Sequence, residues 1–282
     1  MSFDLSTVGF TTQPHALTFD WKVLAAYALG IGAKRDELQY LYENAKGGMK
    51  AYPTFAVVPS YAPVMELLGK CNANMAMVVH GAQLVRIHKA IPDSGTLQTT
   101  GTLKGIYDMK KLGQVILETN TSLNGEPVFD TVWSILVREG GGFDGPRPPP
   151  APPEPTVPKD RPADWTFEET TSPEQALLYR LSGDANPLHA DPEFAAAVGF
   201  PQGPILHGLA TYGFAARAVI KQAAGGDGSR VRAFNGQFRK PVWPGDTLIT
   251  QGWSVDAGKV AFNTTVKGRP EVVLGGGWAE IG

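Results

Sequence analysis

The chain has 282 residues, of which 43% are hydrophobic and 18% charged, and its formal net charge is −2. These values are ordinary for a soluble globular protein that buries a substantial core. Because there is no basic excess to neutralise a nucleic-acid backbone, we expect no nucleic-acid partner.

Cysteine usage and apolar runs indicate the compartment. The single cysteine, Cys71, excludes an internal disulfide framework and fits a reducing environment, and no four-ligand zinc spacing occurs. No apolar run is long enough to span a membrane, the first residues lack a signal-peptide pattern, and the final GGGWAEIG lacks a peroxisomal tripeptide. We therefore expect a cytoplasmic protein without a membrane span.

The first half, residues 1–139, is predicted to contain one helical region followed by several strands. Tyr52-Pro53-Thr54 and Val58-Pro59-Ser60 interrupt its central helix, so we expect loops to replace part of that helix. Residues 140–162 then contain nine prolines, which predict a semi-rigid polyproline II linker.

The second half, residues 163–282, has clearer signals. Ser172-Pro173-Glu174-Gln175 predicts a capped helix that carries Ala176, Leu177, Leu178 and Leu181 inward and stops at Gly183. Asp191-Pro192-Glu193 predicts a short helix closed by Gly199, and the run 206–224 predicts a longer apolar helix. Strands are expected at residues 232–238, 247–254, 259–266 and 272–279.

The two halves resemble each other. HKAIPDSGTL (88–97) and RKPVWPGDTL (239–248) share Lys, Thr and Leu at equal positions, and each half later has a Gly-centred hairpin signal, SLNGEPVFDTVW or TTVKGRPEVVLG. A duplicated unit explains this order, although chance similarity of turn-and-strand segments is the alternative. We predict an α+β double hotdog: two tandem bent antiparallel sheets, each wrapping a helix, paired edge to edge, with the first-half helix reduced.

One loop concentrates chemistry-bearing side chains. In LSGDANPLHAD (181–191), Gly183 ends a helix and Pro187 holds Asn186 in an extended conformation, so Asp184, Asn186 and His189 lie on a stiff loop. Aspartate and histidine form a plausible general acid–base pair acting on a water. The alternative is an ordinary turn in which the Asx side chains bond nearby amides.

A second element favours the catalytic interpretation. Ile205-Leu206-His207-Gly208-Leu209 begins the apolar helix, where the first amides lack intrahelical partners and the helix dipole is positive. Gly208 has no side chain, so an oxygen can approach its N–H closely, as an oxyanion hole requires. His207 by itself fits a packed or capping residue better than a catalyst.

YRLSGDANPLHADPEFAAAVGF followed by PILHGLATYGFAAR resembles the signature of MaoC-like (R)-specific enoyl-CoA hydratases, in the two-hotdog "hydratase 2" form of peroxisomal multifunctional enzyme type 2 and bacterial relatives. The similarity extends to VVHGAQ and FRKPVWPGDTL. The proline-rich linker departs from the pattern of this family. The sequence also lacks the dehydrogenase and sterol-carrier regions of the multifunctional forms. The resemblance implies a stand-alone lyase of fatty acid metabolism and β-oxidation, acting on coenzyme A thioesters as a homodimer.

The resemblance also implies a mechanism. A trans-2-enoyl-CoA is hydrated reversibly to an (R)-3-hydroxyacyl-CoA while Asp184 and His189 hold the water and transfer its protons. Asn186 orients the water or the carboxylate, and the Gly208 amide stabilises the enolate oxygen. Neither a metal nor a redox cofactor is implied.

Binding residues follow from the same resemblance. His80, Gly81 and Phe238 are expected near the acyl–pantetheine path, together with Ala185, Pro187 and Leu188 of the loop. Lys110, in YDMKKLG, is expected near the CoA phosphates, its alternative being a solvated hairpin lysine. Tyr52, Phe55, Val57, Val58 and Met75 line an acyl tunnel or belong to the ordinary core.

Two other functions remain open on sequence alone. A hotdog acyl-CoA thioesterase would attack the same thioester with water, though usually without the GDxNPxH element. A non-catalytic acyl-CoA-binding subunit would retain the fold with an idle site.

Overall fold

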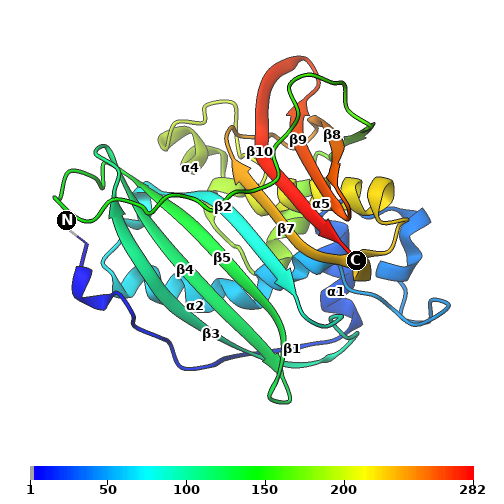
Figure 1. Cartoon of the computed structure of the whole chain (residues 1–282), viewed down its shortest axis with the longest axis horizontal. Coiled ribbons are helices and arrows are strands. Elements are labelled where there is room, and N and C mark those ends of the chain that lie inside the picture. Colours follow the sequence, from blue (N-terminus) through cyan, green and yellow to red (C-terminus); the bar gives the residue numbers. More distant parts are fainter. Residues whose placement is uncertain (1–2) are drawn as a thin grey trace.

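Ten antiparallel strands form one continuous sheet in the computed structural model, which describes residues 3–282 (Figure 1). The strands are β1 (His15–Phe19), β2 (Val78–Ile87), β3 (Gly95–Asp108), β4 (Leu112–Leu123), β5 (Glu126–Arg138), β6 (Trp165–Thr170), β7 (Val231–Phe238), β8 (Thr247–Asp256), β9 (Lys259–Val266) and β10 (Arg269–Ile281). Their order across the sheet is β1-β3-β4-β5-β2-β7-β10-β9-β8-β6. The order of the second five strands repeats that of the first five in reverse, so the sheet contains the same unit twice.

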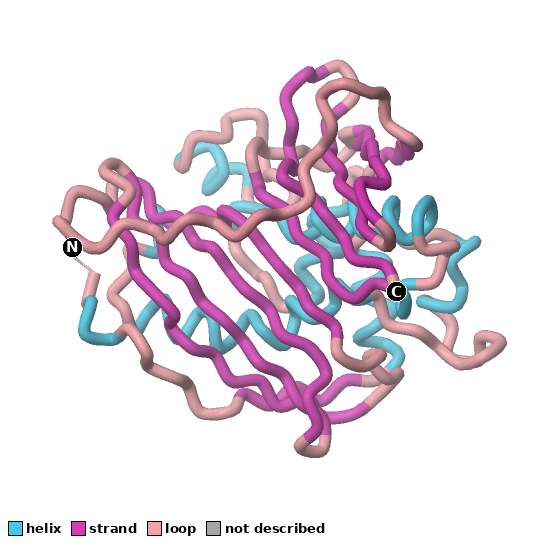
Figure 2. The backbone as a smooth tube through the Cα atoms, viewed as in Figure 1, coloured by secondary structure: helices cyan, strands magenta, loops and turns pink. Residues whose placement is uncertain are grey.

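The helices lie together on one face of this sheet (Figures 1 and 2). They are α1 (Trp21–Gly30), α2 (Val57–Lys70), α3 (Gln175–Tyr179), α4 (Pro192–Ala197) and α5 (Gly208–Ala223). The two longest occupy equivalent places, because α2 packs on β1, β3 and β4 while α5 packs on β6, β7, β8 and β10. This arrangement is the predicted α+β double hotdog.

The seam between the two units is the pairing of β2 with β7, from Ala82 opposite Gln237 to Arg86 opposite Ala233. The edge-to-edge pairing predicted from the sequence is therefore confirmed. The segments 88–97 and 239–248 connect β2 to β3 and β7 to β8, which are equivalent connections, so the duplication is also confirmed.

Several predicted elements of the second half are confirmed. The four expected strands match β7 to β10, α5 lies within 206–224, and Asp191 caps α4 by accepting the amides of Glu193 and Phe194. The helix after Ser172 is α-helical only from Gln175 to Tyr179 (α3) and continues as a 3-10 turn to Ser182, so its predicted end at Gly183 is confirmed. Leu177 and Leu181 are 51% and 71% exposed, so their predicted inward orientation is wrong; so short a helix buries only one narrow side.

The predicted interruption of the first-half helix is only partly present. α2 has 14 residues against 16 in α5, and the Pro53–Ala56 turn precedes it, but Val58-Pro59-Ser60 lies inside the helix. Pro59 is tolerated there because it falls in the first turn, where amides have no intrahelical acceptor. A loop at this position was therefore a wrong prediction.

Helix α5 passes through the centre of the molecule, and every residue from Leu209 to Ile220 is buried. Gly213 is required where α5 meets the first half, because a Cβ at this position would lie 2.3 Å from Ile31 Cγ2. Close contact between the halves thus fixes the position of the helix that begins at Gly208.

Residues 140–164 contain neither helix nor strand and connect β5 to β6. The buried Asp108 carboxylate accepts the amides of Gly142 and Asp144 at 3.0 Å each, and Arg147 Nη1 donates to the Asp108 carbonyl at 2.7 Å. In Figure 2 the segment passes in front of the sheet toward the second half. The division into domains at 140–162 stays a prediction.

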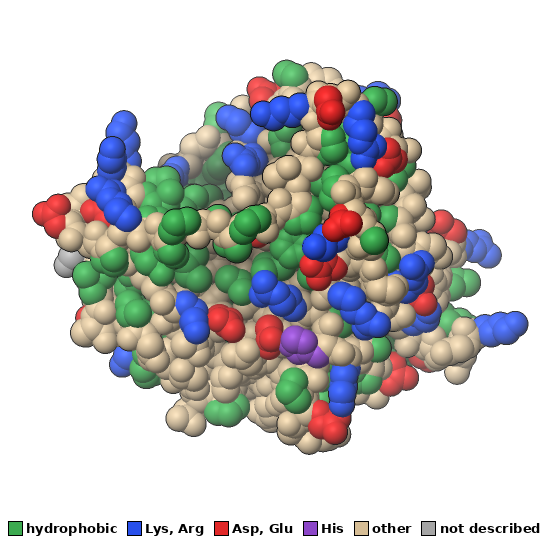
Figure 3. All heavy atoms as spheres, viewed as in Figure 1, with side chains coloured by type: hydrophobic (Ala, Val, Ile, Leu, Met, Phe, Trp, Pro, Cys, Tyr) green, Lys and Arg blue, Asp and Glu red, His purple; other side chains and the backbone are tan. Residues whose placement is uncertain are grey.

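On the face shown in Figure 3, acidic and basic side chains are interspersed. Among residues 3–282, no helix combines the length and the apolar character needed to cross a membrane.

Candidate active site

The loop between α3 and α5 holds Asp184 and Asn186 in a fixed shape. Gly183 ends the preceding 3-10 turn with φ 114°, and Pro187 begins the next one, η6 (Pro187–His189). Asp184 Oδ1 accepts the Asn186 amide at 3.2 Å, and Asn186 Oδ1 accepts the Leu188 amide at 3.0 Å. These two hydrogen bonds are Asx turns, and they are what makes the loop stiff, so the turn and the predicted stiff loop are one structure.

Two stacked imidazoles lie close to Asp184. The ring centroids of His189 and His207 are 3.7 Å apart, and both side chains are buried. His189 Nδ1 donates to the Ile205 carbonyl at 2.8 Å, which leaves its Nε2 with a free lone pair when the ring is neutral. His207 Nε2 donates to the carbonyl of Asp184 at 3.1 Å and so ties the loop to the start of α5.

The acid and the two imidazoles converge. One carboxylate oxygen of Asp184 and one ring nitrogen from each of His189 and His207 lie within 4.8 Å of one another. This separation suits a single bound water, and the same three groups could also hold a metal ion.

Burial keeps these imidazoles neutral. It lowers the pKa of His189, although the Ile205 carbonyl and the Asp184 charge act in the opposite direction. It also lowers the pKa of His207 to about 3, with the neighbouring His189 adding to the effect. A neutral His189 with a free Nε2 can accept a proton from water.

Gly208 is the first residue of α5, so its amide has no intrahelical partner. A Cβ at this position would lie 3.1 Å from Cδ1 of Phe238, at the end of β7. The glycine therefore leaves room between the helix end and the phenyl ring.

The first half supplies the facing wall. His80 in β2 stacks on Trp133 with ring centroids 4.8 Å apart and lies 4.6 Å from the Phe238 centroid. Burial lowers the pKa of His80 to about 4, although the Ala82 carbonyl and the Asp184 charge act to raise it. Gly81 lies at a bulge in β2, where a Cβ would be 2.9 Å from Leu136 Cγ.

Tyr61 is a site residue that the sequence did not reveal. Its hydroxyl, on α2, donates to Asp184 Oδ1 at 3.3 Å. Burial raises its pKa to about 12, with the Asp184 charge and hydrogen bond contributing. No motif surrounds Tyr61, and its partner lies 123 residues away, so only the fold could reveal the contact.

Lys110 lies apart from this group. It occupies the turn between β3 and β4 with φ 72°, and its amide donates to Asp108 Oδ1 at 2.7 Å. Strand register places this turn at the same end of the sheet as the start of β2. Within residues 3–282, no hydrogen bond or ion pair joins its side chain to the loop around Asp184.

Two of the residues considered for an acyl tunnel belong to the core. Tyr52 stacks on Tyr40 at 3.8 Å and donates to Glu37 at 2.5 Å, and Phe55 packs against Tyr27 at 5.6 Å. Both side chains are at most 2% exposed. Their alternative interpretation as ordinary core therefore holds.

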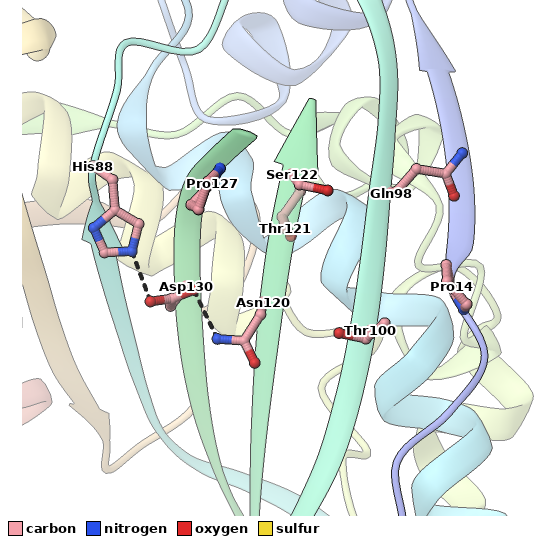
Figure 4. A pocket seen from close by; sticks show the side chains of 9 residues that line it. All are labelled: Pro14, His88, Gln98, Thr100, Asn120, Thr121, Ser122, Pro127 and Asp130. Carbon is pink, nitrogen blue, oxygen red and sulfur yellow. Dashed lines mark hydrogen bonds and ion pairs between the residues drawn. The ribbon is translucent and has the colours of Figure 1, made fainter. Parts of the chain in front are cut away.

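A separate hollow of ≈ 550 Å³ lies on the first-half sheet (Figure 4). Its wall includes Asp130, whose carboxylate already accepts from Asn120 at 2.8 Å and lies 2.7 Å from His88 Nε2. The hollow is open, and its lining residues belong to β3, β4, β5 and connecting segments rather than to a helix, so it lacks the features of the Asp184 loop.

These features define a double-hotdog protein whose second unit carries an acid–imidazole loop beside a helix end. Comparison with known proteins agrees: residues 156–274 match the MaoC like domain, and residues 17–139 match the MFE-2 hydratase 2 N-terminal domain. The chain belongs to the MaoC-like hydratase 2 family.

Individual relatives match over nearly the whole chain. The 3-hydroxyacyl-thioester dehydratase Y of Mycobacterium tuberculosis is 37% identical over 293 residues, covering 99% of each protein. The peroxisomal enoyl-CoA hydratase 2 of Arabidopsis thaliana is 38% identical over 92% of this chain and 89% of its own. The crystal structure of a MaoC-like dehydratase from Phytophthora capsici superposes with a TM-score of 0.88 at 32% identity, covering 99% of this chain and 98% of that one.

Proposed function

We propose that the protein catalyses the reversible hydration of trans-2-enoyl-CoA to (R)-3-hydroxyacyl-CoA. One observation carries this proposal: the Asp184 carboxylate and the His189 imidazole converge within 4.8 Å, beside the helix end that presents the Gly208 amide. The relatives named enoyl-CoA hydratase and 3-hydroxyacyl-thioester dehydratase support the same reaction.

In the forward direction, Asp184 and His189 hold one water on one face of the substrate. Nε2 of His189 or the Asp184 carboxylate takes a proton as the water oxygen bonds to C3, and the C2–C3 π electrons move toward the thioester oxygen. The Gly208 amide, aided by the α5 dipole, stabilises the enolate oxygen. Return of a proton to C2 completes the addition of one water, and the fixed geometry favours one enantiomer.

The remaining residues act in binding. His80, Gly81 and Phe238 border the acyl–pantetheine path, as do Ala185, Pro187 and Leu188, and Asn186 orients the water or the carboxylate. Lys110 contacts the CoA phosphates from the same end of the sheet as His80. The proximity of Phe238 to both His80 and Gly208 supports this assignment.

The reaction requires neither a metal nor a redox cofactor, because proton transfer and amide donation suffice for the addition. A chelator should therefore leave the rate unchanged. Loss of activity on chelation, restored by a divalent ion, would instead assign Asp184, His189 and His207 to a metal.

The proposal is tested with crotonyl-CoA and longer enoyl-CoA substrates. Loss of the enoyl absorbance without release of free thiol, with an (R)-3-hydroxyacyl product, supports the hydratase. Thiol release would support a thioesterase, and substrate binding without turnover would support an acyl-CoA-binding subunit.

A homodimer and a cytoplasmic location complete the proposal. The first rests on the family resemblance and is tested by light scattering of the purified protein. The second rests on the sequence and is tested by cell fractionation.

A further inference from the structure

We propose that Tyr61, from the first half of the chain, is a positioning residue that fixes the catalytic carboxylate of Asp184 in the second half. This inference rests on the proposed hydratase function. Its basis is the hydrogen bond from the Tyr61 hydroxyl to Asp184 Oδ1 at 3.3 Å.

The hydrogen bond from Tyr61 comes from outside the loop, unlike the other hydrogen bond to Asp184 Oδ1. Oδ1 also accepts the Asn186 amide at 3.2 Å, but Asn186 belongs to the same loop and moves with it. Tyr61 lies on α2, so its hydroxyl fixes the carboxylate relative to the rest of the molecule. With both donors on Oδ1, Oδ2 is left to hold the water.

The neighbouring residue holds α2 in place. Ser60 is fully buried, and its hydroxyl lies 2.8 Å from that of Thr119 on β4 and accepts from Thr131 on β5 at 3.3 Å. Thr131 Oγ1 in turn accepts from Nε1 of Trp133 at 2.7 Å, and Trp133 stacks on His80. One polar cluster therefore fixes both Tyr61 and the first-half wall of the site.

Tyr61 acts as a donor. Because burial, together with the Asp184 charge, raises its pKa to about 12, the phenol keeps its proton at neutral pH. A neutral hydroxyl beside a carboxylate can orient it but cannot serve as the base that removes a proton from water.

The variant Tyr61→Phe removes only the hydroxyl. We expect kcat for crotonyl-CoA to fall about tenfold, as for loss of one hydrogen bond to a charged group, while KM changes less than about twofold. The matched control is Tyr40→Phe, which loses a buried hydroxyl bonded to Gly226 and Gly228 away from the site. It should lower the thermal midpoint and leave kcat unchanged.

Three results would overturn the inference: an unchanged kcat in Tyr61→Phe, a rise in KM alone, or an equal kcat loss in the Tyr40→Phe control. An inactive wild-type protein would instead count against the proposed function. The contact itself is tested without turnover by a double-mutant cycle of Tyr61→Phe and Asp184→Asn on the unfolding equilibrium. Non-additive changes support it, and additive changes contradict it.

Discussion

The two halves of the molecule have the same topology but use one equivalent segment differently. Between the first helix and the central helix, the second half places residues 180–207 and the first half places residues 31–56. The second-half segment gathers Asp184, His189 and His207 around a space that can hold water. The first-half segment instead buries Glu37 and Tyr52 in the core. In the proposed function, the same place in the scaffold therefore serves chemistry in the second half, whereas in the first half it serves as structural support.

The first-half segment also supports the second half. Glu37 forms a salt bridge with Arg217, a fully buried residue of α5, and Arg217 also pairs with Glu169 at 2.6 Å. The helix that presents Gly208 is therefore held by the first half, while α2 of the first half contacts Asp184 through Tyr61. Each half completes a structure in the other, so neither half alone should form the site.

The largest expected effect is a loss of kcat when an acidic residue is replaced in the second-half segment but not in the first-half segment. Asp184→Asn should lower kcat for enoyl-CoA hydration on the order of 10²–10⁴-fold, because it removes one general acid–base group. Asp36→Asn, which changes an exposed acid of the first-half segment, should leave kcat within about twofold, since surface substitutions have small effects. Steady-state kinetics of both variants check this prediction. Equal losses of kcat would contradict the different roles assigned to the two segments.

Removing the charge that supports α5 should cost stability. Glu37→Gln leaves the buried Arg217 with one charged partner, so we expect the free energy of unfolding to fall by about 3 kcal/mol in denaturant titrations. The surface variant Glu118→Gln, which loses an ion pair with Lys104, should cost less than about 1 kcal/mol.

The Glu37 effect should also depend on pH. Interactions with Arg217, Tyr52 and Lys221 outweigh burial and lower the Glu37 pKa from 4.5 to about 2. A lowered carboxyl pKa gives stability that is complete above pH 4.5 and lost as the pH falls through about 2. The difference between the wild-type protein and Glu37→Gln should shrink across that window, and a difference independent of pH would contradict this assignment.

Glycine substitutions compare the two central helices. Gly208→Ala places a methyl group 3.1 Å from the Phe238 ring, beside the amide that we propose stabilises the enolate, so kcat should fall on the order of 10²-fold. Gly69 occupies α2 with open space around its Cβ position, so Gly69→Ala should raise stability by up to about 1 kcal/mol and leave kcat unchanged. Full activity in Gly208→Ala would contradict the proposed role of the Gly208 amide in stabilising the enolate.

The repeated architecture and the shape of the loop around Asp184 could be predicted because their signals are local. Gly183 and Pro187 fix the loop through their own backbone preferences, and His207-Gly208 marks a helix start. The hairpin turn at Asn124-Gly125, with φ of 53° and 82°, likewise follows from its two residues.

Contacts between the halves could not be predicted in this way. Tyr61 and Asp184 are 123 residues apart, and Glu37 and Arg217 are 180 apart, so no spacing rule relates them. Pro59 was misinterpreted because a proline predicts a break unless the exact first turn of the helix is known. Leu177 was misplaced because inward orientation was assumed along a regular α-helix, whereas the α-helical part has only five residues.

The smallest effect concerns the buried imidazoles of the second half. Burial lowers the pKa of His207 to about 3, so the unfolded chain binds a proton there at a higher pH than the folded protein does. The stability contributed by this group is complete above pH 6.5 and is lost as the pH falls toward 3. In His207→Gln, the slope of unfolding free energy against pH near pH 5 should therefore decrease by up to about 1.4 kcal/mol per pH unit. Above pH 7 the slopes of the two proteins should coincide, and equal slopes at pH 5 would show that His207 titrates alike in both states.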